Sequence, residues 1–104
     1  MFGLEPEEIS QMQHIFAKYP QICQVAVFGS RAKGNYNPWS DIDLAIFGNS
    51  IGLDVINSLD NELDDLMLPI YVDLLVVNQV ENETIKTQIH QDGKIFYQAN
   101  GIVV

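Results

Sequence analysis

Residues 40–47 read SDIDLAIF, and this stretch decides how the rest of the chain is interpreted. Its two isoleucines and its leucine alternate with the aspartates, so a strand with a period of two would place the three apolar side chains on one face. Asp41 and Asp43 would then share the opposite face. The pattern predicts a half-buried strand from Asp41 to Phe47 that presents two carboxylates side by side.

The segment before this strand is a second candidate for chemistry. Cys23 to Phe28 is short, β-branched and aromatic, and therefore predicts another strand, which stops at Gly29. The polar residues that follow predict one or two turns of helix. A glycine lets a phosphate approach the backbone closely, and a helix N-terminus offers N–H donors. Gly29 and Ser30 are therefore candidate phosphate-binding residues. Arg31 is a third candidate, although a solvated charge explains this residue equally well.

A third acid, Asp73, is the lone charge in the apolar stretch from Ile70 to Val77. This nearly continuous apolar character predicts a central strand covered on both faces. An ionised side chain in such a strand is costly unless something pairs with it, and no basic residue is nearby in the sequence. If this strand lies beside the strand from Asp41 to Phe47, cross-strand Cβ atoms about 5 Å apart would bring three carboxylates into one site.

Three converging carboxylates repel one another, and a protein relieves this repulsion by protonating one of them or by binding a divalent cation. Oxygen ligands favour Mg²⁺, which prefers one or two carboxylates together with substrate phosphates. Asp41, Asp43 and Asp73 are therefore candidate magnesium ligands beside a phosphate-bearing substrate. Taken singly, each has a simpler explanation: Asp41 as a turn residue, Asp73 as a solvated acid at a strand edge, and Gly29 as an ordinary turn after a strand.

The remaining chain alternates between helical and strand-like patterns, which predicts a sheet of three to four strands packed by helices. Apolar residues spaced three and four apart predict helices over three segments, Pro6 to Lys18, Leu53 to Leu66 and Asn82 to His90. The segment from Lys94 to Gln98 is compatible with a short final strand or with a continuation of the preceding helix.

Composition limits the class of protein. With 47% hydrophobic residues, residues 1–104 are expected to form a single domain with one core. Five Lys and Arg against fourteen Asp and Glu give a net charge of −9, which argues against a direct, sequence-independent grip on nucleic acid. A single cysteine, Cys23, cannot form an intrachain disulfide, and no apolar stretch approaches the ~20 residues that span a bilayer. We therefore expect a cytoplasmic protein without a membrane partner.

The three motifs together resemble the DNA polymerase beta-type nucleotidyltransferase superfamily, and in particular its minimal nucleotidyltransferases. In that group a Gly-Ser pair precedes an Asp-hydrophobic-Asp pair by about ten residues and a third Asp stands on a later strand, as Gly29, Ser30, Asp41, Asp43 and Asp73 do here. The resemblance implies an α+β fold with a small mixed sheet. It also implies that the first two aspartates hold two Mg²⁺ ions, that the third completes the inner metal site and helps to activate the acceptor hydroxyl, and that the Gly-Ser pair binds the phosphates of ATP.

Minimal nucleotidyltransferases are typically paired in prokaryotes with a small helical HEPN toxin, and they act as the antitoxin by transferring AMP to a tyrosine of that toxin. The resemblance thus implies a magnesium-dependent protein adenylyltransferase, the antitoxin of a type VII pair, which forms a hetero-oligomer with a HEPN partner. Two alternatives remain open: a catalytically silent nucleotide-binding module that neutralises its partner by contact, and a small-molecule nucleotidyltransferase. The small-molecule transferase is the less favoured of the two, because we expect no extra domain that would hold a small acceptor molecule.

Overall fold

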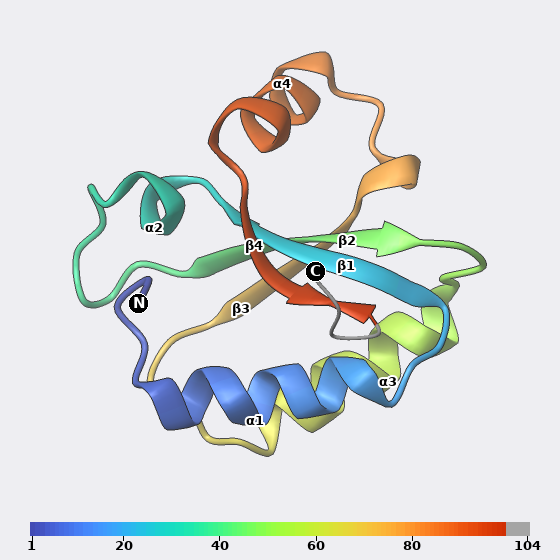
Figure 1. The fold of residues 1–104 in the computed structure, drawn as a ribbon, viewed down its shortest axis with the longest axis horizontal. Helices are drawn as coiled ribbons and strands as arrows, with labels where there is room; N and C mark the ends of the chain where they lie inside the picture. Colours follow the sequence, from blue (N-terminus) through green and yellow to red (C-terminus); the bar gives the residue numbers. More distant parts are fainter. Residues whose placement is uncertain (100–104) are drawn as a thin grey trace.

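The computed structural model of the chain describes residues 1–99, so residues 100–104 of the expected single domain lie outside the described part. Helices and strands alternate along most of this range (Figure 1). The elements are, in order, α1 (Pro6–Ala17), β1 (Ile22–Phe28), α2 (Ser30–Lys33), β2 (Ile42–Gly48), α3 (Leu53–Asp64), β3 (Val72–Val76), the 3₁₀ turn η1 (Val77–Gln79), α4 (Glu83–Asp92) and β4 (Lys94–Gln98).

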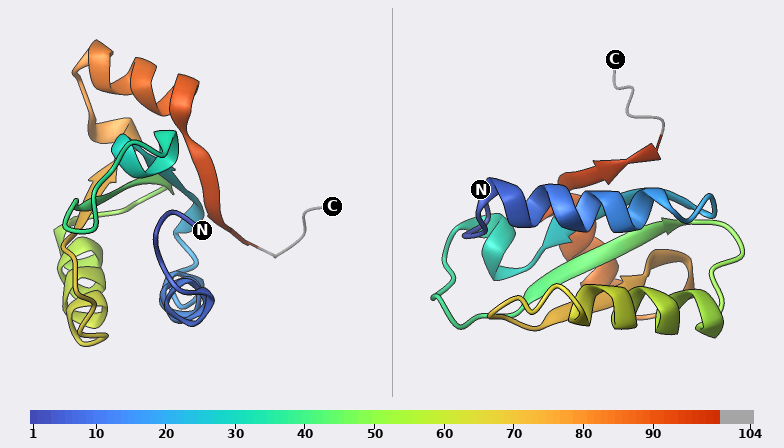
Figure 2. Two further views of the ribbon diagram at one scale, coloured as in Figure 1. Left: turned by 90° about the vertical axis from the view of Figure 1, so that its left-hand side faces the viewer. Right: turned by 90° about the horizontal axis from the view of Figure 1, so that it is seen from below.

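The strands form one four-stranded sheet in the order β3-β2-β1-β4. β1 runs antiparallel to both β2 and β4, whereas β2 and β3 are parallel, so the sheet is mixed. Helices α1 and α3 lie side by side below the sheet and α4 lies above it (Figures 1 and 2). This arrangement confirms the predicted α+β fold with a small mixed sheet packed by helices.

β3 departs from its predicted place in the sheet. The segment from Ile70 to Val77 was expected to form a central strand, but the strand is only five residues long and lies at the sheet's edge. Its apolar residues serve the helix-facing side, where Val72 and Val76 are buried in the core. Its other face carries the exposed Asp73. The apolar residues on either side of this five-residue strand lengthen the apolar stretch. For this reason the sequence resembles that of a strand covered on both faces.

The hydrophobic core lies between the sheet and the pair of helices α1 and α3. The apolar face predicted for β2 is confirmed, because Ile42, Leu44 and Ile46 are completely buried. The residues that α1 and α3 bury against this face are Met12, Ile15, Phe16, Val55, Leu59 and Leu63. Each fully buried apolar side chain of this kind stabilises the fold by about 1.5–3 kcal/mol, so this layer holds β2 in place.

The end of the described chain is a strand. β4 pairs with β1 and buries Phe96, which decides between the strand and the helix that the sequence left open. The preceding helix α4 begins at an Asn82 cap, whose side-chain oxygen accepts hydrogen bonds from two backbone N–H groups. At Gly93 the chain turns into β4, and a Cβ there would lie 2.4 Å from the carbonyl oxygen of Ile89.

Among residues 1–99, the helices are all too short and too polar to cross a bilayer.

Candidate active site

Asp43 projects from β2 on the face opposite the core, and Asp41 directly precedes the strand, which begins one residue later than predicted. Ile42 and Leu44 are fully buried, whereas Asp41 is exposed and Asp43 is half-buried. The alternation of a strand therefore separates packing from chemistry within four consecutive residues. This is the arrangement that the sequence predicted for the pair.

Asp73 joins this pair from the neighbouring strand. β2 and β3 are parallel, and their register places Asp73 directly opposite Asp43. Opposed residues in a sheet point to the same face, so both carboxylates leave the sheet on one side. The structure thus brings Asp41, Asp43 and Asp73 together, as expected for a shared site.

The electrostatics of the trio reflect this crowding. The pKa of Asp43 is raised, first by burial of its carboxyl group and then by repulsion from the charges of Asp73 and Asp41. A hydrogen bond with Asp73 raises it further. The ion pairs within residues 1–99 join other residues, so no Lys, Arg or His side chain in that range is salt-bridged to the trio. A cation would relieve this repulsion.

The donor set fits magnesium only in part. Over the described range, no three His, Cys, Asp or Glu side chains are gathered tightly enough to hold a metal ion by themselves. Mg²⁺ does not require such a cage, because it usually keeps water and takes one or two carboxylates plus substrate phosphates. The trio therefore suits an ion that arrives with a phosphate-bearing substrate better than an ion bound permanently.

Gly29 lies against this trio. It follows Phe28, which pairs with Asp43 across β1 and β2, and its φ of +74° is in the region that favours glycine. A Cβ at Gly29 would stand 2.6 Å from Oδ2 of Asp43, so a side chain there would displace the carboxylate. Ser30 comes next and opens α2. The predicted phosphate-binding turn and the predicted metal ligands are thus direct neighbours.

Arg31 has a different environment from the one the sequence suggested. Its side chain is 3% exposed, so the solvated alternative is wrong. Nε and Nη2 donate hydrogen bonds to the Ser40 carbonyl at 3.0 and 2.7 Å, and Nη1 donates to the Phe2 carbonyl at 2.8 Å. The guanidinium also lies 4.6 Å from the centre of the Tyr36 ring. These contacts are directed inside the protein and tie the guanidinium to the N-terminal segment and to the loop before Asp41.

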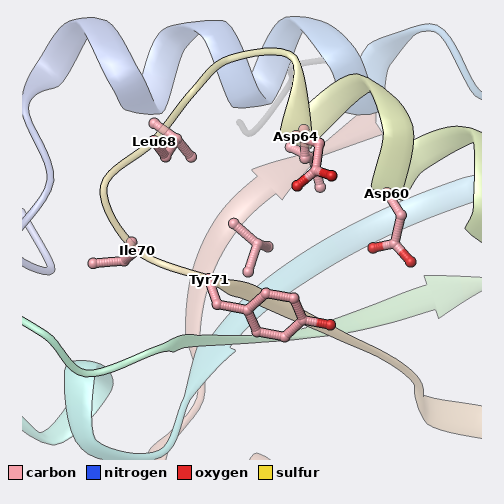
Figure 3. Close-up of a pocket in the computed structure, with 7 residues that line it drawn as sticks. Asp60, Asp64, Leu68, Ile70 and Tyr71 are labelled. Atoms are coloured by element: carbon pink, nitrogen blue, oxygen red, sulfur yellow. The ribbon is translucent and has the colours of Figure 1, made fainter.

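A cavity that no sequence pattern indicated lies between α3 and the start of β3 (Figure 3). Its volume is about 290 Å³, and it is lined by Asp60, Leu63, Asp64, Leu68, Ile70, Tyr71 and Val72. No motif marks these residues, because the cavity forms only where the helix, the connection and the strand meet.

The comparisons with known proteins agree with this geometry. Residues 10–101 match the family described as "Polymerase beta, Nucleotidyltransferase". The chain belongs to this family. It is a nucleotidyltransferase, and the resemblance recognised in its motifs is confirmed.

Two relatives of this nucleotidyltransferase come from Methanocaldococcus jannaschii. They are named "Putative protein adenylyltransferase MJ1217" and "Putative protein adenylyltransferase MJ0126". The chain is 34% identical to the first and 33% identical to the second, in each case over an alignment of 92 positions that covers 81% of this chain and 93% of the relative.

Solved structures share the fold of the nucleotidyltransferase. One, described as a toxin-antitoxin with AMP-PNP, superposes with a TM-score of 0.71 at 20% identity, over 93% of this chain and 76% of that chain. Another, a tri-AMPylated Shewanella oneidensis HEPN toxin in complex with MNT antitoxin, gives a TM-score of 0.68 at 16% identity, over 92% and 74% of the two chains. At these identities the likeness establishes the fold.

Proposed function

We propose that this protein is a magnesium-dependent adenylyltransferase that transfers AMP from ATP to a tyrosine hydroxyl of a HEPN-type partner, and that it thereby acts as the antitoxin of a type VII pair. The proposal rests above all on one observation, the register that sets Asp73 opposite Asp43 beside the Gly29 turn. The names of the two archaeal relatives and the toxin-antitoxin complexes that share the fold support the choice of a protein acceptor.

The metal ligands in this proposal are the three aspartates. Asp41 and Asp43 would hold two Mg²⁺ ions together with the triphosphate, and Asp73 would complete the inner site. When bound, the metal neutralises negative charge on the triphosphate and on the leaving pyrophosphate. The raised pKa of Asp43 supports this assignment, because crowded acids without a cation favour protonation.

The chain's other residues position the reactants. Gly29 and Ser30 would orient the phosphates at the end of β1, where the glycine leaves room for close approach. Asp73 would accept the proton of the tyrosine hydroxyl. The tyrosine oxygen then forms a bond to the α-phosphorus as the bond between that phosphorus and the pyrophosphate oxygen breaks, and pyrophosphate leaves on the opposite side.

The proposal also covers the domain organisation, the compartment and the partner of the protein. We take residues 1–104 as one minimal nucleotidyltransferase domain that works in the cytoplasm and forms a hetero-oligomer with its partner. The net charge of −9 supports a basic partner surface, because complementary charge steers association. The chain then needs neither a nucleic acid nor a membrane as a direct partner.

The test is transfer of label from ATP. The purified protein is incubated with Mg²⁺, ATP labelled at the α-phosphate and the HEPN protein encoded beside it, and we expect label on a tyrosine of that protein. Label transfer that is absent from a folded, nucleotide-binding preparation would count against the proposal.

The same experiment separates chemistry from neutralisation by contact. The double variant Asp41→Asn/Asp43→Asn should still bind the partner but should no longer label or neutralise it. Neutralisation that survives in this variant would support the silent binding module instead. Labelling of small hydroxyl compounds in place of the partner would support the small-molecule transferase.

A further inference from the structure

The cavity between α3 and the start of β3 lies at the edge strand that carries Asp73. Figure 3 shows the carboxylates of Asp60 and Asp64 along one side of it and the ring of Tyr71 along the other. Its apolar wall consists of Leu63, Leu68, Ile70 and Val72. The cavity therefore combines two carboxylates and a tyrosine ring with a smaller apolar wall.

The order of the strands sets this cavity on one particular side of the reaction. Gly29 ends β1, Asp43 lies on the next strand β2, and Asp73 lies on β3 at the edge of the sheet. Tyr71 and Val72, at the start of β3, line the cavity. The Gly29 turn, the crowded acids and the cavity thus follow the order of the strands, with the cavity at the β3 edge on the side of the sheet that faces α3.

In-line displacement requires the attacking oxygen to approach opposite the leaving group. If Gly29 and Ser30 hold the phosphates at the β1 side, pyrophosphate leaves there and the acceptor must enter from the β3 side. The cavity is on that side. The charge of Asp73 also makes the smallest of three contributions to the raised pKa of Asp60, after burial and the charge of Asp64.

We propose that this cavity receives the acceptor tyrosine of the partner protein, with basic partner residues next to that tyrosine held by Asp60 and Asp64. This inference rests on the proposed function, which it deepens by assigning the acceptor's place. At about 290 Å³ the cavity is just below the ~300–1,000 Å³ typical of small-molecule sites, so it suits one inserted side chain. Its leucine and isoleucine wall suits an aromatic ring.

Exposed apolar side chains near this end of the sheet support a protein occupant. Trp39 is 81% exposed, Met67 85% and Tyr71 61%. Trp39 is in the loop before Asp41, Met67 is in the connection from α3 to β3, and the Tyr71 carbonyl accepts a hydrogen bond from the Ile42 N–H. Tyrosine, tryptophan and methionine are enriched at protein interfaces. A partner that inserts a tyrosine into the cavity would cover them.

The test compares variants inside the cavity with matched variants outside it. Leu68→Trp fills the cavity and Asp64→Lys reverses the charge at its rim. Their controls are Leu53→Trp, at an exposed position at the start of the same helix, and Asp65→Lys, at an exposed acid that does not line the cavity. Three quantities are measured with the HEPN partner: kcat/KM for label transfer, the Kd of the partner for protein loaded with Mg²⁺ and AMP-PNP, and the Kd of AMP-PNP itself.

We expect both cavity variants to lower kcat/KM for the partner and to weaken partner binding by about tenfold or more, the equivalent of at least 1.4 kcal/mol, while AMP-PNP binding stays within about twofold. The two controls should match the wild type in all three quantities. Cavity variants that match their controls overturn the inference, and so does a loss of AMP-PNP affinity confined to them, because the cavity would then hold the nucleotide.

The failure of this inference is distinct from the failure of the proposed function. A wild-type protein that binds the partner without labelling it defeats the proposed function, yet the partner Kd of the four variants still decides what the cavity binds. A wild-type protein that does not bind the partner at all overturns both.

Discussion

The two edge strands of the sheet, β3 and β4, have the same length but opposite roles. Each contains five residues and has one hydrogen-bonded neighbour in the sheet. β3 carries the exposed Asp73 in register with Asp43, whereas β4 carries Phe96, which is 3% exposed and packs edge-on against the Phe16 ring at 6.3 Å. One edge therefore supplies chemistry and the other supplies core. Substitutions at the two edges should separate activity from stability.

The largest effect is expected at Asp73. In the variant Asp73→Asn, AMP transfer to the partner should fall by about 10²–10⁴-fold, because the amide cannot accept the hydroxyl proton and no longer carries charge for a metal. The melting temperature without metal should not fall, since the replaced side chain is exposed. Label transfer and thermal unfolding are measured on the same preparation.

A matched substitution on the other edge strand is Lys94→Gln, which also removes one exposed charge. It should leave both quantities unchanged. If Asp73→Asn transfers AMP at the rate of Lys94→Gln, β3 does not contribute to the chemistry.

The second largest effect is expected at Phe96. Removing this ring in Phe96→Ala should lower the free energy of unfolding by about 3–5 kcal/mol, through lost burial and the cavity left behind. The transfer rate per folded molecule should stay close to that of the wild type, because β4 holds none of the proposed site residues. Urea unfolding monitored by circular dichroism gives the first quantity, and activity corrected for the folded fraction gives the second. A specific loss of activity in the folded fraction would contradict the division between the edges.

Much of this arrangement could be predicted from local patterns. Alternation of apolar and acidic residues placed Asp41 and Asp43 on the outer face of β2, and apolar spacing located helices close to α1, α3 and α4. Position in the sheet could not be read in this way. The apolar stretch that contains β3 would look the same in a central strand and in an edge strand flanked by packed loops. Which strands pair with it depends on the whole chain.

Arg31 and the cavity show the same limit. The sequence shows a basic residue in a Gly-Ser turn, but only the fold reveals that its donors reach the carbonyls of Phe2 and Ser40. The cavity depends on how the connection after α3 packs beside β3, and residues that meet through packing leave no periodic signal. Contacts between residues far apart in the sequence thus determine the environment of Arg31 and the presence of the cavity, and local patterns predict neither.

A third prediction concerns the glycine at the end of β1, on the side of the sheet away from β3. Gly29→Ala should cost about 1–3 kcal/mol, because a φ of +74° with a ψ of −153° is essentially confined to glycine, and it should also weaken Mg²⁺–AMP-PNP binding, because the new Cβ would displace the Asp43 carboxylate. Gly34→Ala is the matched control, since Gly34 has a φ of +85° but no atoms within 4 Å of an added Cβ. Gly34→Ala should also lose stability, since Gly34 has a left-handed conformation, but it should keep nucleotide affinity. Equal nucleotide affinities in the two variants, measured by titration calorimetry, would show that Gly29 is only a turn.

The smallest effect is expected from the charge of Asp43 without metal. Its folded pKa is above the ordinary value of 3.8, so stability decreases as pH rises from 3.8 through the folded pKa. Asp43→Asn should therefore melt above the wild type at pH 7, by less than the ~4–8 °C that 1 kcal/mol gives in a domain of this size. The difference should vanish below pH 3.8, where the wild-type carboxyl is protonated in both states. Thermal scans in EDTA measure it.

With Mg²⁺ and AMP-PNP present, the wild type should melt above Asp43→Asn. A ligand bound by the folded state stabilises that state, and the variant has lost a metal ligand. A wild type and an Asp43→Asn variant that gain equally from Mg²⁺–AMP-PNP would place the metal elsewhere.

The most direct measurement is a crystal structure of the protein soaked with Mn²⁺ and AMP-PNP, with the metal located by its anomalous signal. We expect Mn²⁺ at roughly 2.0–2.2 Å from carboxylate oxygens of Asp41 and Asp43, Asp73 alongside, and the phosphates over Gly29 and Ser30. An ion bound between Asp60 and Asp64, or a triphosphate held away from the Gly29 turn, would contradict the account.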